Sequence, residues 1–159
     1  MMMAPAGGGA QYTLHPGDVA WGVRGDRFET LLGSCIAVVL TDPLRTIGAM
    51  CHIVHCAARS DAPRDSSWGD IALAHMYELL LQHGIVPRLC EGYIYGGGNM
   101  FPDLFGGGVH IGANNADWTL TALLKDGVRV LHSDVGGTAY RKLSWTVGPE
   151  APLAVAVEV

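Results

Sequence analysis

The sequence predicts an α+β fold, a single-domain layered α/β sandwich in which mixed strands and two main helices share one interior. Three observations predict it. The chain has 159 residues, 49% of them hydrophobic, which is enough for one well-buried domain. Short apolar runs of strand length recur along the chain. Two longer segments carry apolar residues every three to four positions, the spacing of amphipathic helices.

The first part of the chain predicts a tail followed by strands. Residues 1–10 lack both a basic region and a long apolar stretch, so we expect a short disordered tail and no secretory signal. Residues 11–159 are expected to form the single domain, because no repeat or linker divides them. Apolar runs bounded by turn residues predict strands at 19–23, 28–32, 36–40 and 47–54.

The remainder predicts two helices and four more strands. Ser66 and Ser67 are candidate N-caps for a helix over 68–83 that ends at Gly84. Asn114 opens the second predicted helix, which Gly127 closes. The further strands are expected at 89–95, 128–132, 139–147 and 153–159.

Charge and cysteine content exclude several classes of protein. The net charge is −5, from 10 basic and 15 acidic residues without a basic run, so nucleic acid is not an expected partner. No apolar stretch approaches the ~20 residues that span a bilayer, so we expect no membrane insertion. Without a signal peptide, the four cysteines are expected to be free thiols in the cytoplasm. They are Cys35, Cys51, Cys56 and Cys90.

Cys35 is the strongest candidate for chemistry. It stands at a Gly33-Ser34 bend directly before an apolar run, and His52 lies at matching parity on the next run. A thiolate beside an imidazole can attack a carboxamide or acyl carbon. Backbone N–H groups at the bend could bind the resulting oxyanion. The competing interpretation of Cys35 is a small buried hydrophobic residue, because free cysteines are among the most buried residue types.

A metal site is the alternative for the segment Cys51-His52-Ile53-Val54-His55-Cys56. On a strand, alternation sends Cys51 and His55 to one face and His52 and Cys56 to the other, which disfavours a single ion. On a helix the pairs would share a side, so the alternative stays open. We expect no metal and no cofactor.

Several segments together resemble the CheD family, the chemoreceptor glutamine deamidases of bacterial chemotaxis. The resemblance runs from about Pro16 to Val147. The segments follow one another in the family's order, which makes them far more specific than any single motif. They are TLLGSCIAV at 30–38, DP at 42–43, IGAMCH at 47–52, GDIA at 69–72, GGGNMF at 96–101, IGANN at 111–115 and DVGG at 134–137.

The resemblance implies a fold, an activity and a set of site residues. Such proteins convert selected glutamines of methyl-accepting chemotaxis receptors to glutamates. The implied nucleophile is Cys35 and the implied base is His52, acting through a thioester with release of ammonia. The family's third catalytic residue is a threonine, whose position falls on Glu29 without a gap and on Thr30 with a one-residue deletion. Thr30 is preferred, because a hydroxyl orients an imidazole without adding charge.

The resemblance also implies partners. The cytoplasmic region of a chemoreceptor is the expected substrate, and a CheC-type phosphatase is an expected partner. The chain could therefore act instead as a non-catalytic regulatory binding module. The presence of both Cys35 and His52 favours the enzyme.

Overall fold

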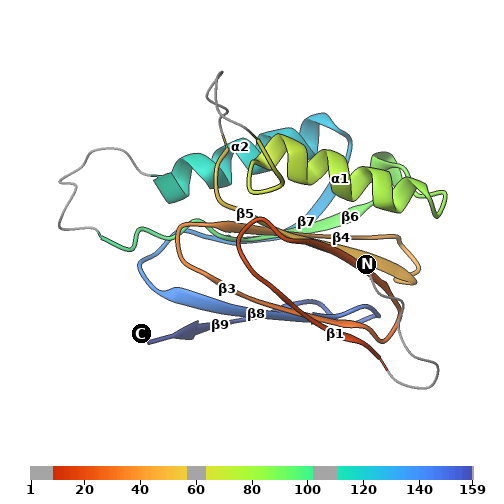
Figure 1. Cartoon of the computed structure of the whole chain (residues 1–159), viewed down its shortest axis with the longest axis horizontal. Helices are drawn as coiled ribbons and strands as arrows, with labels where there is room; N and C mark the ends of the chain where they lie inside the picture. Colours follow the sequence, from red (N-terminus) through yellow and green to blue (C-terminus); the bar gives the residue numbers. More distant parts are fainter. Residues whose placement is uncertain (1–8, 57–63, 102–110, 159) are drawn as a thin grey trace.

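The fold consists of three layers, two helices, a five-stranded sheet and a four-stranded sheet (Figure 1). The computed structural model describes residues 9–56, 64–101 and 111–158. The smaller sheet has the order β1-β3-β8-β9 and the larger one β2-β5-β4-β6-β7. The elements are β1 Gln11–Leu14, β2 Val19–Val23, β3 Arg27–Leu32, β4 Ile36–Thr41, β5 Ile47–Ile53, α1 Gly69–Leu81, a 3₁₀ turn Pro87–Leu89, β6 Glu91–Gly96, α2 Ile111–Lys125, β7 Arg129–Val135, β8 Tyr140–Thr146 and β9 Leu153–Val157.

The central strand β4 is buried on both faces, as its uninterrupted apolar run predicts. Alternate side chains of β4 enter two separate cores. Ile36 and Val38 belong to the core on the helix side, whereas Ala37 and Val39 belong to the core between the sheets. The larger sheet therefore separates two hydrophobic layers, and successive residues of β4 face one or the other.

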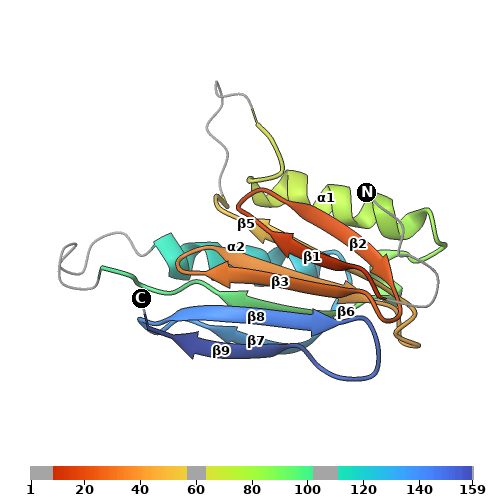
Figure 2. The ribbon, with the colours of Figure 1, turned by 60° about the horizontal axis from the view of Figure 1, so that its bottom comes forward.

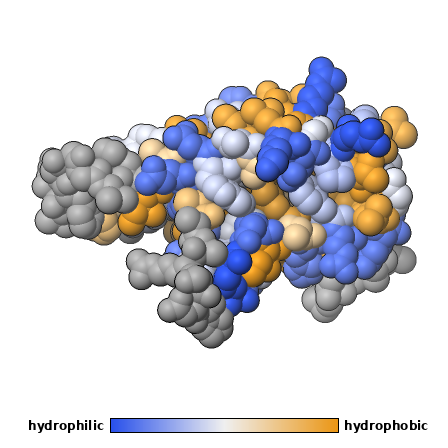
Figure 3. Space-filling model, turned by 90° about the horizontal axis from the view of Figure 1, so that it is seen from above, coloured by the Kyte–Doolittle hydropathy of each residue, from blue (hydrophilic) through white to orange (hydrophobic). Residues whose placement is uncertain are grey.

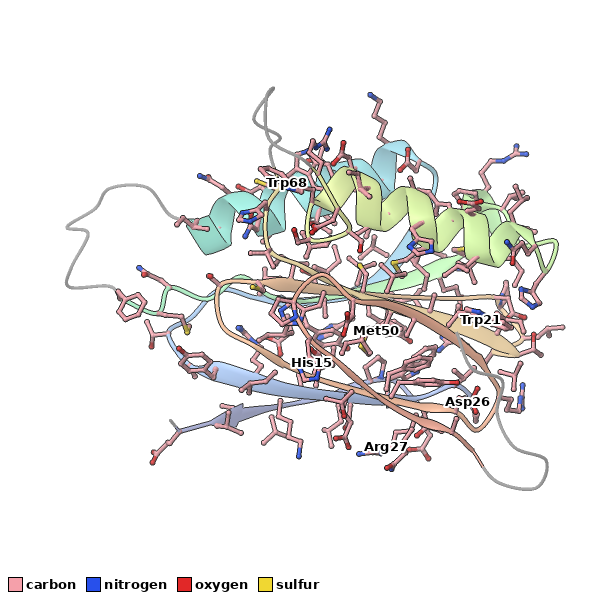
Figure 4. The ribbon with its side chains drawn as sticks, viewed as in Figure 1. His15, Trp21, Asp26, Arg27, Met50 and Trp68 are labelled. Atoms are coloured by element: carbon pink, nitrogen blue, oxygen red, sulfur yellow. The ribbon has the colours of Figure 1, made fainter. Side chains whose placement is uncertain are left out.

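The same alternation decides which side chains of β5 face the smaller sheet. Cys51 and Ile53 lie in the core on the helix side. Met50 lies in the core between the sheets, where Figure 4 shows it pointing toward the smaller sheet. His52 has the parity of Met50, so its imidazole also faces the smaller sheet.

The two outer sides of the molecule differ. The helices cover one face of the larger sheet, and on their outer side polar and apolar groups are interspersed (Figure 3). On the opposite side, β8 and β9 run side by side at the edge of the smaller sheet (Figure 2). Within the described residues, no helix has the length and apolar character that crossing a membrane requires.

Most predicted elements are confirmed, with boundaries shifted by a few residues, and one strand was not predicted. That strand, β1, has four residues and pairs in parallel with β3. Of the predicted tail, residues 1–8 lie outside the described part of the chain. Its last residue, Ala10, donates its N–H to Asp26 Oδ1 at 2.9 Å and accepts from the N–H of Arg27 at 2.8 Å.

The predicted N-cap of α1 and the predicted start of α2 are wrong, although α1 begins within one residue of its expected start. The residue before α1 is Trp68, and within the described residues its side chain makes no capping hydrogen bond to the helix. Ser66 donates its hydroxyl to the Gly17 carbonyl, and Ser67 donates to Asp65, so neither hydroxyl is available as a cap. Asn114 does not open α2, because the helix already includes Ile111.

Candidate active site

Both the backbone and the imidazole ring of His52 form hydrogen bonds with neighbouring segments. The residue is 2% exposed. Its N–H donates to the Asp18 carbonyl at 3.1 Å, and its carbonyl accepts from the Gly17 N–H at 2.9 Å. Pro16-Gly17 forms the tight turn between β1 and β2, and Gly17 has φ 90° there, which glycine adopts readily. These two hydrogen bonds fix the position of β5 at His52.

Thr30 contacts the imidazole from the opposite sheet. The residue is 3% exposed on β3, and its Oγ1 lies 2.8 Å from His52 Nδ1 and 2.9 Å from the Leu14 carbonyl oxygen. A hydroxyl has one proton, and a carbonyl only accepts. All three groups are satisfied when Thr30 donates to Leu14 and accepts from Nδ1–H of His52. This tautomer leaves Nε2 with a free lone pair, as a general base requires.

Glu29, the other candidate for the third position, does not contact His52. Its carboxylate pairs with Arg27, Nε to Oε1 at 3.0 Å and Nη2 to Oε1 at 3.0 Å. Glu29 precedes Thr30 on the same strand, so its side chain leaves the opposite face of the sheet. The structure thus brings Thr30, and not Glu29, to the imidazole.

Cys35 lies directly before β4, on the face of the sheet that carries His52. Its half-buried side chain packs against the core between the sheets. In the β4–β5 ladder Ala37 is opposite His52. Cys35 precedes Ala37 by two residues on the same face, so it lies diagonally from His52 just beyond the end of the ladder. Within the described residues no hydrogen bond joins the thiol to the ring.

A glycine loop after β6 holds the backbone around Cys35. The N–H of Gly97 donates to the Cys35 carbonyl at 2.9 Å, and that of Gly98 donates to the Gly33 carbonyl at 2.9 Å. At Gly96, where φ is 111°, a Cβ would lie 2.1 Å from the Cys35 carbonyl oxygen. Only glycine permits this approach, so the loop fixes the bend that carries the thiol.

Burial sets the resting charge state of the pair. It lowers the pKa of His52 to about 4 and raises the pKa of the Cys35 thiol. At neutral pH the imidazole is therefore uncharged and the thiol protonated. This state suits a base that takes the thiol proton during attack, rather than a preformed ion pair.

Comparison with known proteins identifies the family. Residues 55–149 match the family model described as CheD chemotactic sensory transduction. The chain is 34% identical over 138 residues to a probable chemoreceptor glutamine deamidase CheD 2 of Albidiferax ferrireducens, covering 84% of this chain and 80% of that protein. The chain belongs to the CheD family.

Other relatives carry the same family name. A probable chemoreceptor glutamine deamidase CheD of Pseudomonas syringae pv. syringae is 33% identical over 145 residues, which are 86% of this chain and 78% of that protein. One of Methanococcus vannielii is 34% identical over 126 residues, 79% of this chain and 81% of the relative. Among solved structures, a Neisseria meningitidis protein of the DUF152 family has a TM-score of 0.49 at 13% identity, covering 82% of this chain and 65% of that one.

The cysteines and histidines after β4 do not converge in this CheD chain. Cys51 is fully buried on the helix side, where burial raises the pKa of its thiol to about 12. His52 faces the other core. His55 packs against Trp68, with ring centroids 4.5 Å apart and ring planes tilted by 37°. In the described ranges no three His, Cys, Asp or Glu side chains are grouped so as to hold a metal ion.

Some contacts of the site were not predicted from the sequence. Leu14 contributes only a carbonyl, and no side-chain pattern signals a backbone acceptor. Asn115 of α2 reaches the Ser34 carbonyl at 3.3 Å. Arg141 donates to the carbonyls of Gly96 at 3.2 Å and Gly136 at 2.7 Å, which links two glycine loops. The assignment of Gly33 and Ser34 as oxyanion donors stays a prediction.

Proposed function

We propose that this chain is a cysteine-dependent deamidase that converts glutamine side chains of methyl-accepting chemotaxis receptors to glutamate. The observation that carries the proposal is the 2.8 Å contact between Thr30 Oγ1 and His52 Nδ1, on the sheet face that also bears Cys35. This contact fixes the orientation of the imidazole, which supports its assignment as the base for Cys35. The relatives named probable chemoreceptor glutamine deamidases supply the substrate class.

The first half of the reaction releases ammonia. His52 Nε2 takes the proton from Cys35 Sγ as the sulfur attacks the side-chain carbonyl carbon of the glutamine. The carbonyl oxygen becomes an oxyanion, and we assign its stabilisation to the backbone N–H groups of Gly33 and Ser34. The tetrahedral intermediate then collapses. The C–N bond breaks, ammonia leaves with the proton from Nε2, and a thioester remains on Cys35.

The second half consumes one water molecule. Nε2 accepts a proton from the water as its oxygen attacks the thioester carbonyl. The C–S bond breaks, and Cys35 regains its proton from the imidazolium. One amide and one water thus become one carboxylic acid and one ammonia. Throughout, Thr30 holds the Nδ1–H, so the ring presents Nε2 in both halves.

A defined assay tests the proposal. The full-length protein is incubated with the cytoplasmic fragment of a chemoreceptor, and tryptic peptides are followed for the gain of about 1 Da that accompanies amide hydrolysis. The native protein should produce this gain at specific glutamines. Cys35→Ala should reduce the rate by at least about 10³-fold while its circular dichroism stays unchanged. Full activity of Cys35→Ala would contradict the proposal.

The same variant separates catalysis from binding. A regulatory module that captures a CheC-type phosphatase or a receptor needs no thiol, so Cys35→Ala would retain its whole effect on the partner. A pull-down of receptor fragment or phosphatase with native protein and variant, run beside the assay, distinguishes the two functions. Deamidation by the native protein alone, with equal partner capture by both proteins, is the expected result.

A further inference from the structure

The strands β4 and β5 separate beside Cys35. Their ladder pairs Ile36 with Ile53, and the next pair would join Cys35 to Val54. Instead, the Val54 N–H donates to the Ser67 carbonyl at 2.8 Å. The backbone after β5 therefore turns toward the segment that leads into α1. At the thiol, sheet pairing no longer sets the distance between the two strands.

One side chain bridges the gap. Asn115 of α2, 2% exposed, donates its Nδ2 to the Ser34 carbonyl at 3.3 Å and to the Val54 carbonyl at 3.1 Å. Ser34 directly precedes the thiol residue, and Val54 is two residues beyond the imidazole. The two protons of a single amide group thus connect the backbone of Cys35 to the backbone of His52.

An asparagine at this position is not needed for packing. The buried face of α2 repeats at helical spacing and otherwise consists of small or apolar residues and one threonine: Gly112, Ala116, Thr119 and Leu123. Gly112 allows α2 to approach the glycine loop closely, because a Cβ there would lie 2.5 Å from the Gly97 carbonyl. Burying an amide is unfavourable unless it is hydrogen-bonded. The two hydrogen bonds of Asn115 therefore account for a polar side chain at this buried position.

We propose that Asn115 is a positioning residue that holds the thiol of Cys35 in register with His52. The inference rests on the proposed function, because it assigns the bridge a part in that chemistry. Misplacing a reacting group by about 1 Å can reduce a rate about 10²-fold. With the bridge removed, the bend at Gly33-Ser34 keeps its contacts to the glycine loop but loses its link to β5. The thiol and the base then move independently.

A double-mutant cycle on thiol reactivity tests the inference without a receptor. The rate of Cys35 alkylation by iodoacetamide at pH 7 is followed by peptide mass spectrometry. His52→Ala should slow alkylation about tenfold when Asn115 is present, because the base is lost. In an Asn115→Ala or Asn115→Asp background, His52→Ala should change the rate less than about twofold. Aspartate keeps the shape of asparagine, but when ionised it donates no proton and when protonated it can serve only one of the two carbonyls.

Thr119→Val is the matched control. Thr119 is buried on the same face of α2, one turn later, and among the described residues its hydroxyl bonds only the Asn115 carbonyl, 2.8 Å away. This variant should keep the tenfold effect of His52→Ala. Thermal unfolding of all variants identifies any that do not fold, and the alanine and aspartate variants substitute for each other in that case.

Each outcome decides between the two proposals. If His52→Ala still slows alkylation tenfold in both Asn115 backgrounds, the positioning inference is overturned and the deamidase proposal is unaffected. If the coupling disappears but the native protein deamidates no receptor fragment, Asn115 still positions the thiol against the imidazole, and the proposed function fails. If His52→Ala leaves alkylation unchanged in the native background, both are overturned.

Discussion

Cys35 and Cys51 belong to neighbouring, paired segments of one sheet, yet they occupy entirely different environments. Cys51 is fully buried in the core that includes Met76 of α1, and burial raises the pKa of its thiol to about 12. Cys35 is half-buried at the end of the sheet, on the face that carries His52. Burial raises the pKa of its thiol as well.

The difference shows that the face of the strand and the position along it, rather than the residue type, separate a structural thiol from a candidate nucleophile. A thiol within a strand is enclosed by its neighbours on both sides. A thiol before the first ladder pair has a loop on one side, and glycines shape that loop. A base on the opposite strand is then useful only to the thiol on its own face.

His52→Ala should have the largest effect after loss of the Cys35 thiol itself. Removing a general base reduces a rate about 10²–10⁴-fold, and we expect a loss of about 10³-fold in the deamidation assay. Circular dichroism should stay unchanged. Substantial turnover by a folded His52→Ala protein would show that the base is elsewhere, and Cys35 and Cys51 would then differ only in exposure.

Stability should fall on acidification because of the same imidazole. The pKa of His52 is about 4 in the folded chain and about 6.5 when unfolded, so between these values the unfolded state binds more protons. The stabilising contribution is complete above pH ~6.5 and is lost as the pH falls toward 4. It amounts to about 3 kcal/mol by linkage. Urea unfolding at pH 7.5 and pH 4.5 measures it.

The His52→Gln variant is the control for this pH dependence. It places no titrating group between the sheets, so its stability should change less between the two pH values than that of the native protein. An identical pH dependence in both proteins would contradict the assigned pKa of His52.

Thr30→Val should reduce deamidation about tenfold to thirtyfold. Valine keeps the shape of threonine but leaves Nδ1–H of His52 and the Leu14 carbonyl without their partner, so the ring loses its orientation. Unfolding should also require about 1–3 kcal/mol less. Glu29→Gln, on the neighbouring position of β3, should stay within about twofold of the native rate. A larger loss of deamidation rate in Glu29→Gln than in Thr30→Val would instead assign Glu29 as the third catalytic residue.

Cys51→Ala should have the smallest effect on chemistry. Its thiol faces the helices, so the deamidation rate should stay within about twofold of native. The loss of a buried sulfur from the core should reduce the free energy of unfolding by about 1 kcal/mol. A large loss of activity in a folded Cys51→Ala protein would remove the distinction between the two cysteines.

By itself, the sequence determined the helices and strands and which side chains lie on the same face of a strand. Periods of two and of 3.6 residues are local properties, so they predicted eight of the strands, both helices and the shared parity of Cys35 and His52. They also predicted that Cys51 and His52 face opposite ways. The family motifs pointed to the thiol and the imidazole, because both lie in continuous segments of recognisable sequence.

The tertiary structure decided the contacts that cross layers. Thr30 rather than Glu29 meets His52 because β3 packs against β5 from another sheet. The short strand β1 exists because it pairs with β3, and its last carbonyl determines the tautomer of the imidazole. Asn115 reaches Ser34 across 81 residues of sequence. Such contacts depend on which distant elements share a layer, and the local pattern of a chain does not contain this information.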